Sequence, residues 1–145
     1  MATPPDPASL PCSPLDETGG LKYFPRMTGK IRLQKAGQLW TELTENLGKG
    51  SDGKCTSFHH VAYYDLKERV LDGGSDAAVL RWCQEKGRPL NETDLLVWNA
   101  YISKLGWNDQ NSPILLRRKM DSGLAARDDI ETIAHYIDVD EGRRP

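Results

Sequence analysis

Cysteine is scarce in this sequence, and the spacing of the few cysteines argues against both a disulfide framework and a structural zinc site. The 145 residues contain only Cys12, Cys55 and Cys83, and no two of them have the CxxC spacing. An odd number of widely separated cysteines does not make a disulfide framework. Without a CxxC pair, a thiolate zinc site is not expected either. We therefore expect free thiols, with Cys83 filling core space beside Trp82.

Long apolar runs are also missing. No stretch approaches the roughly 18 apolar residues that a membrane-spanning helix requires. The N-terminus has no basic start followed by an apolar core, the pattern of a secretory signal. We therefore expect no membrane partner and a cytoplasmic location.

The sequence has no excess of positive charge. Nineteen lysines and arginines stand against 21 acidic residues, which gives a formal net charge of −2. A protein dedicated to nucleic acid usually carries a strong basic excess, because it must neutralise phosphates. We therefore expect no nucleic-acid partner.

Diagnostic motifs of catalysis and cofactor binding are missing as well. The Gly-rich segment 48–55, GKGSDGKC, matches neither GxGxxG nor GxxxxGK[ST], so a surface turn is its simpler interpretation. The GxSxG motif of serine hydrolases does not occur. His59 and His60 are adjacent and would point in different directions, which disfavours a shared metal ion. The acidic residues 138–141 lack the remaining ligands of a calcium loop. The sequence identifies no cofactor, and we predict no metal site.

The patterns that are present indicate a mostly α fold. Residues 1–20 contain five prolines. This composition predicts a disordered or extended Pro-rich arm, followed by one compact domain over 21–145. We expect five or six helices around a buried central helix at about 91–105, because Leu95–Ser103 carries no charge and is apolar nearly all round. The other expected helices cover 25–37, a short segment at 40–47, 58–71, 76–86, 112–123 and a last one opened by a capping box at Asp128 and Glu131. Residues 48–53 are expected to form a loop.

Several blocks of this sequence resemble a family of small, mostly bacterial proteins known only as a domain of unknown function. The blocks are PRMTGKIRLQKAG, GKGSDGKC, RWCQEKGRPLNE, VWNAYISKLGW and GLAARDDIETIAHYIDVDEGR. Together they cover nearly all of the chain after residue 20, whereas the Pro-rich arm and the His59–His60 pair lie outside the resemblance. The resemblance implies one compact domain, and it implies no known activity or catalytic residues.

Charge segregation is the feature that points to a site. Residues 21–41 contain five basic groups and no acid, while residues 121–141 contain seven acids and one arginine. The simplest interpretation is structural: the tail folds back so that Arg26, Lys30 or Arg32 pairs with Asp138, Asp140 or Glu141. The functional interpretation is a polar pocket between the two segments. There the three basic residues would hold an anionic group, and Asp138 or Asp140 would act as a base or metal ligand. Trp107, after a helix-ending glycine, is the aromatic residue expected at a pocket rim.

Two hypotheses of function follow. In the first, the domain binds or processes a small anionic molecule between the basic first helix and the acidic tail. In the second, it is a non-enzymatic interaction module whose Pro-rich arm binds a partner protein, since such segments lose little entropy on binding. The sequence leaves open whether the protein is an enzyme, and it leaves the oligomeric state open too.

Overall fold

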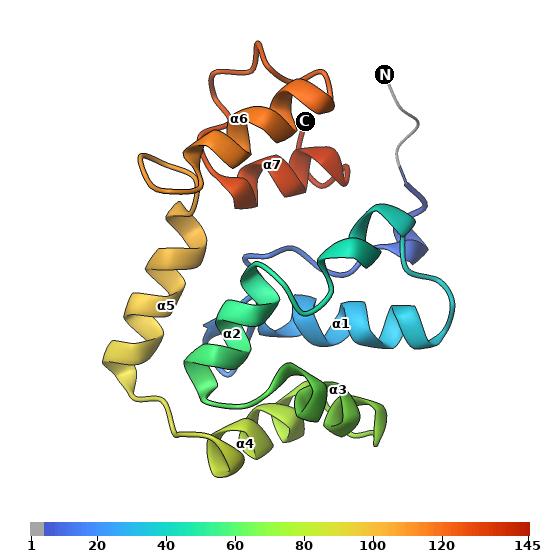
Figure 1. The fold of residues 1–145 in the computed structure, drawn as a ribbon, viewed down its shortest axis with the longest axis vertical. Helices are drawn as coiled ribbons and strands as arrows, with labels where there is room; N and C mark the ends of the chain where they lie inside the picture. The colour runs from blue at the N-terminus through green and yellow to red at the C-terminus, as the bar shows by residue number, and fades with distance from the viewer. Residues whose placement is uncertain (1–4) are drawn as a thin grey trace.

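The computed structural model describes residues 5–145 and confirms a mostly α fold in one compact body (Figure 1). The described residues contain seven α-helices, where the sequence predicted five or six. In chain order the elements are η1 (Pro7–Ser9), β1 (Glu17–Thr18), β2 (Leu21–Lys22), α1 (Phe24–Lys35), η2 (Thr41–Asn46), α2 (Ser51–His59), α3 (Tyr63–Leu71), α4 (Asp76–Lys86), α5 (Glu92–Lys104), α6 (Ser112–Asp121) and α7 (Ile133–Asp140), where η marks a 3-10 helix. Across residues 5–145, no helix has both the length and the apolar character needed to cross a bilayer.

The centre of the core is α1, and the prediction that helix 91–105 is buried at the centre is wrong. Phe24, Met27 and Ile31 of α1 are fully buried, and α1 packs against α3, α4 and β1. Helix α5 lies along one edge of the molecule (Figure 1), where Leu96 is 71% exposed and Val97 57% exposed. Its uncharged stretch reflects one buried face, formed by Trp98 and Ile102, and one apolar face that remains at the surface.

The apolar side chains form two separate clusters. The larger cluster joins β2 and α1 to α5, and the smaller one lies between the end of α5, α6 and α7 around Leu105, Leu115 and Ile133. Tyr101 of α5 packs against both clusters. Polar groups also join the part of the fold around α1 to the part around α6 and α7, through the pair formed by Arg26 and Glu141.

The described part of the Pro-rich arm, residues 5–20, contains η1 and β1 and otherwise has no regular structure, and it packs against the body around residues 11–14. Pro11, Ser13 and Pro14 are buried, and the arm ends in a two-residue turn at Gly19 and Gly20 between β1 and β2. Both glycines have positive φ, the geometry that a tight hairpin turn requires. Residues 1–4 of the predicted arm lie outside the described residues.

Helix α2 begins inside the segment that the sequence predicted as a loop. Gly48 and Gly50 have positive φ and make the turn, and the helix then starts at Ser51. The Asp52 carboxylate accepts a hydrogen bond from the Gly48 backbone N–H at 3.1 Å and so holds the turn against the new helix. The helix expected over 58–71 is therefore two helices, separated at His60, whose φ of 61° ends α2.

Candidate functional site

The three basic residues predicted to hold an anion have three different acidic partners. Arg26 forms a bidentate pair with Glu141, with N···O distances of 2.9 and 2.7 Å. The Lys30 ammonium lies 2.8 Å from Asp52 of α2, and Arg32 lies 2.7 Å from Asp76 at the start of α4. Only Arg26 therefore meets the acidic tail, and the positive charge of all three is already matched within the protein.

The Arg26–Glu141 pair belongs to a polar cluster that we call the tail clasp, formed by Pro11, Cys12, Ser13, Arg26, Asp138, Glu141 and Arg143. Arg26 also donates to the Cys12 carbonyl at 2.9 Å, while Arg143 pairs with Glu141 at 2.7 Å and donates to the Pro11 carbonyl. Burial lowers the pKa of Arg26, but the hydrogen bonds and charge of Glu141 outweigh it and raise that pKa above its ordinary value. The tail thus folds back onto α1, as the structural interpretation expected.

The remaining predicted residues lie in different surroundings. Asp138 is buried in the tail clasp, where it pairs with Arg143 at 3.0 Å and accepts from the Ser13 hydroxyl at 2.9 Å. Asp140 is half-buried, and burial and the nearby carboxylates of Glu42 and Glu141 raise its pKa. Trp107 follows α5 and is 52% exposed. The six predicted site residues are therefore divided among the tail clasp, the α1–α2 and α1–α4 contacts and the surface.

The environment of Asp140 predicts a stability change that depends on pH. A carboxyl group whose pKa is raised by folding favours the folded state fully below its unfolded pKa of about 3.9, and this contribution is lost as pH rises through the folded pKa. Asp140→Asn cannot ionise, so it should stabilise the protein at pH 7 and have no such effect near pH 3.5. Urea unfolding at both pH values measures this, with exposed Asp128→Asn as the control. An equal effect of Asp140→Asn at both pH values would contradict the explanation.

A second buried cluster joins α1 to α2 and was missed by the sequence reasoning. The Tyr23 hydroxyl donates to Asp52 at 2.7 Å, and the Lys30 ammonium contacts both the Asp52 carboxylate and, at 3.0 Å, the Tyr23 oxygen. Burial lowers the pKa of Lys30 despite the opposing charge of Asp52, and burial together with Asp52 raises the pKa of Tyr23. All three side chains are buried, so this cluster holds two helices in place and presents no surface to a ligand.

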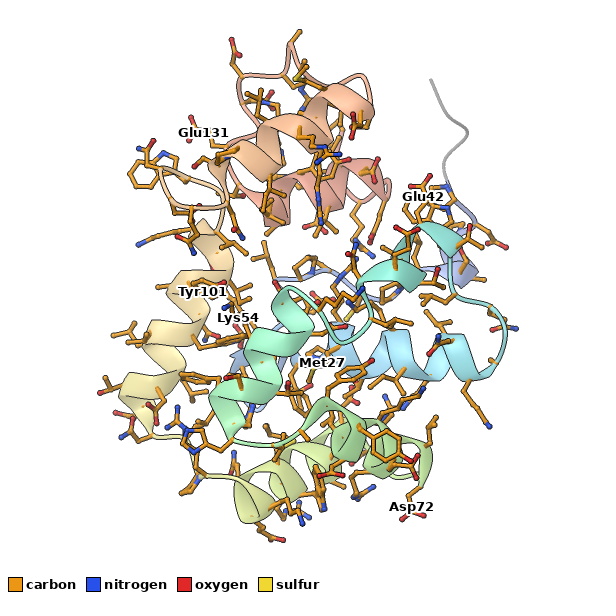
Figure 2. The ribbon with its side chains drawn as sticks, viewed as in Figure 1. Met27, Glu42, Lys54, Asp72, Tyr101 and Glu131 are labelled. Atoms are coloured by element: carbon orange, nitrogen blue, oxygen red, sulfur yellow. The ribbon has the colours of Figure 1, made fainter. Side chains whose placement is uncertain are left out.

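An open groove of about 420 Å³ lies between α2 and α5. Its floor is aromatic: Phe58 of α2 stacks on Trp98 of α5 at 5.2 Å between ring centroids, and Trp98 lies 5.7 Å from Tyr101. Figure 2 shows Lys54 on α2 and Tyr101 on α5 at the facing sides of this groove. The groove exists because the apolar face of α5 is left uncovered beside α2.

The polar groups at the groove are cationic or neutral. Lys54 and His60 come from α2 and its C-terminal end, and Arg88 comes from the segment before α5; Ser57 is the other polar lining residue. The Arg88 guanidinium lies over the Phe58 ring at 4.6 Å and donates to the Phe58 carbonyl at 2.7 Å. Asp94 pairs with Arg88 at 3.3 Å and partly balances its charge, but no carboxylate lines the groove among the described residues.

His60 occupies an unusual backbone conformation for its residue type. Its φ of 61° and ψ of 38° lie in the left-handed region, which glycine or asparagine adopts at lower cost. This geometry ends α2 and leaves the exposed imidazole at the groove. Sequence reasoning could have found the site from Lys54 and Phe58, four residues apart, and from Trp98 and Tyr101, three apart, had α2 been recognised as a helix.

Candidate metal ligands do not gather in this structure. Among residues 5–145, no group of three or more histidine, cysteine, aspartate or glutamate side chains is arranged to hold a metal ion. His59, next to the groove, is fully buried between Phe24 and Phe58, and its Nδ1 is 3.0 Å from the Cys55 carbonyl. Its Nε2 has no hydrogen-bond partner, and burial lowers its pKa, so the ring is held neutral.

The fold and groove define a small, mostly α-helical domain that carries an aromatic groove with a cationic rim. The chain belongs to the family described as domain of unknown function DUF5069, whose model matches residues 8–143. The expectation that the Pro-rich arm lies outside the family pattern is therefore wrong for residues 8–20, which include Pro11 and Pro14, whereas residues 1–7 lie outside the match. No curated protein matches the chain.

Proposed function

We propose that this protein binds a small anionic molecule that carries a planar apolar group, in the groove between α2 and α5. The observation that carries the proposal is the convergence of three aromatic side chains, the cationic side chains of Lys54 and Arg88 and the imidazole of His60 on one groove without a lining carboxylate. The groove volume of about 420 Å³ lies within the range of ordinary small-molecule sites, roughly 300–1,000 Å³. A cytoplasmic location in a bacterial cell, expected from the sequence and its resemblance, remains part of this proposal.

Each half of the proposed ligand has a partner in the groove. A planar ring would lie against the aromatic floor, since offset and edge contacts between aromatic groups add to the burial of apolar area. The anionic group would lie toward Lys54 and Arg88, where hydrogen bonds to charged donors are short and strong, with the His60 imidazole beside them. The ligand class is that of the first sequence hypothesis, but the place is different, because the donors of Arg26 and Lys30 are occupied by Glu141 and Asp52.

The alternative, a partner protein bound by the Pro-rich arm, has less support from the geometry. Pro11 and Pro14 are buried on the protein itself, and the Pro11 and Cys12 carbonyls accept hydrogen bonds from Arg143 and Arg26. A partner would therefore have to displace these contacts before it could bind residues 11–14.

Binding of 1-naphthyl phosphate tests the proposal directly. We expect isothermal titration calorimetry to show 1-naphthyl phosphate binding at least tenfold more tightly than neutral 1-naphthol. Lys54→Glu should weaken the phosphate by about tenfold, equivalent to about 1.4 kcal/mol, because it places a negative charge at the rim. Lys35→Glu makes the same charge change on the exposed end of α1 and serves as the control.

Two results would count against the proposal. Equal affinity for the phosphate and the neutral alcohol would show that the cationic rim contributes nothing. Equal weakening by Lys54→Glu and Lys35→Glu would show that overall charge, and not the groove, attracts the anion.

A further inference from the structure

Helix α6 lies at the end of the molecule farthest from α3 and α4 (Figure 1), and it carries exposed apolar side chains. Leu116 is 55% exposed and Met120 is 61% exposed. They lie four residues apart and therefore on one side of the helix, whereas Leu115 and Lys119 are buried on the other side. Two large apolar side chains exposed side by side on one helix are available for contact with another protein.

Opposite charges flank this apolar pair in a specific order. Arg117 and Asp121 are also four residues apart, so they lie along one edge of the pair, and both are exposed. Neither side chain forms an ion pair with any residue between 5 and 145. Leu116 and Met120 therefore lie beside one exposed charge of each sign, and neither charge has an ion-pair partner among residues 5–145.

We propose that α6 pairs with α6 of a second copy, antiparallel, about a two-fold axis that runs between the two helices, perpendicular to both, at the level of Arg118 and Lys119. A two-fold contact uses the same surface on both copies, so the surface must be complementary to itself. The rotation reverses the helix direction and brings Leu116 beside Met120 of the second copy. The rotation leaves the Arg117–Asp121 edges of the two helices on the same side of the interface, so Arg117 lies opposite Asp121 of the second copy. Each contact occurs twice.

The expected dimer is weak because α6 is short. Its ten residues span roughly 15 Å, so the helix pair alone buries less surface than the roughly 1,600 Å² of a standard stable interface. The proposal concerns a surface separate from the groove between α2 and α5, and it stands whether or not the groove binds an anion. We expect the full chain to be monomeric at about 10 μM and substantially dimeric near 1 mM, within the range of weak interfaces.

Sedimentation equilibrium across that concentration range, combined with a charge exchange, tests the pairing. Arg117→Asp places like charges opposite each other and should raise the dissociation constant at least tenfold. The double change Arg117→Asp with Asp121→Arg restores opposite charges and should return the constant to within about threefold of the original. Met120→Glu should also abolish the dimer. Leu96→Glu alters a more exposed apolar side chain on α5 and should leave the dimer unchanged.

The outcomes separate the proposal from its rivals. Circular dichroism verifies the fold of each variant, and Met120→Ser replaces Met120→Glu if the latter unfolds. A monomer at 1 mM overturns the proposal. A dimer that survives both Arg117→Asp and Met120→Glu overturns it as well, because the contact then lies elsewhere. Failure of the double change to restore the dimer overturns the antiparallel register.

Discussion

Asp52→Ala is expected to lower the free energy of unfolding by about 3–5 kcal/mol, the cost of leaving one member of a buried ion pair without its partner. Without Asp52, the Lys30 ammonium and the Tyr23 hydroxyl lose their shared acceptor in the interior, and the Gly48 N–H loses its carboxylate partner. Urea unfolding followed by the fluorescence of the four tryptophans measures the change. Exposed Asp128→Ala is the control and should stay within about 0.5 kcal/mol of the original protein.

A double change tests the reason for this loss. Lys30→Met with Asp52→Asn removes both charges together, so no uncompensated charge remains buried. We expect the double variant to be more stable than Asp52→Ala, because replacing a whole buried pair is often close to neutral. If Asp52→Ala costs less than about 1 kcal/mol, the pair does not hold α1 against α2 in the way described.

The second large effect is expected at Gly87, between α4 and α5. A Cβ added there would lie 1.8 Å from the His59 carbonyl oxygen, far inside van der Waals contact. Gly87→Ala must therefore push this segment away and break the 3.0 Å hydrogen bond from the Arg88 N–H to that carbonyl. We expect a loss of about 3 kcal/mol, the upper end for overpacking, and weaker binding of 1-naphthyl phosphate because Arg88 moves.

Gly29→Ala is the matched control, and its expected effect has the opposite sign. An added Cβ would meet the Pro11 side chain at 3.6 Å, an ordinary contact. Alanine is favoured over glycine inside a helix by roughly 0.5–1 kcal/mol, so this variant should equal or exceed the original protein in stability. Similar losses at Gly29 and Gly87 would contradict the close approach at Gly87.

Helices with strong local signals could be predicted from the sequence. The expected span 76–86 is the span of α4, and the Ser75 side chain accepts from the Ala78 N–H as an N-cap. Asn91 and Asp94 form the capping box expected at the start of α5. Pro113 lies in the first turn of α6. In each case the signal lies within a few residues of the helix end, where backbone groups have no helical partner.

Elements that depend on distant residues could not be predicted in this way. The capping box expected at Asp128 and Glu131 is wrong, since α7 begins at Ile133 with Thr132 as its cap. The preceding turns are held by the Lys119 ammonium, which donates to the carbonyls of Arg127 and Ile130 from α6. Nothing near residue 128 in the sequence indicates that contact.

The candidate site, too, could be predicted only in part from the sequence. Charge segregation correctly placed the tail near α1, but the partner of each basic residue depends on which side of α1 it occupies. Arg26 faces the tail, whereas Lys30 faces α2 and Arg32 faces α4. The groove was not predicted because it requires two features that the sequence did not indicate. Residues 51–53 belong to helix α2, where a loop was expected, and α5 lies at the edge of the molecule, where a central helix was expected.

The tail clasp has a consequence for how the chain is made. Arg26 is translated 115 residues before Glu141. The Arg26 guanidinium forms its other hydrogen bond with the backbone carbonyl of Cys12. Until that glutamate emerges from the ribosome, a guanidinium that belongs in the interior has no counter-charge. Contacts over such a separation close slowly because of the loop entropy they cost. The arm and α1 can therefore reach their final packing only after residue 141 has been synthesised and has left the ribosome, so this part of the core stays incomplete while the intervening 114 residues are being made.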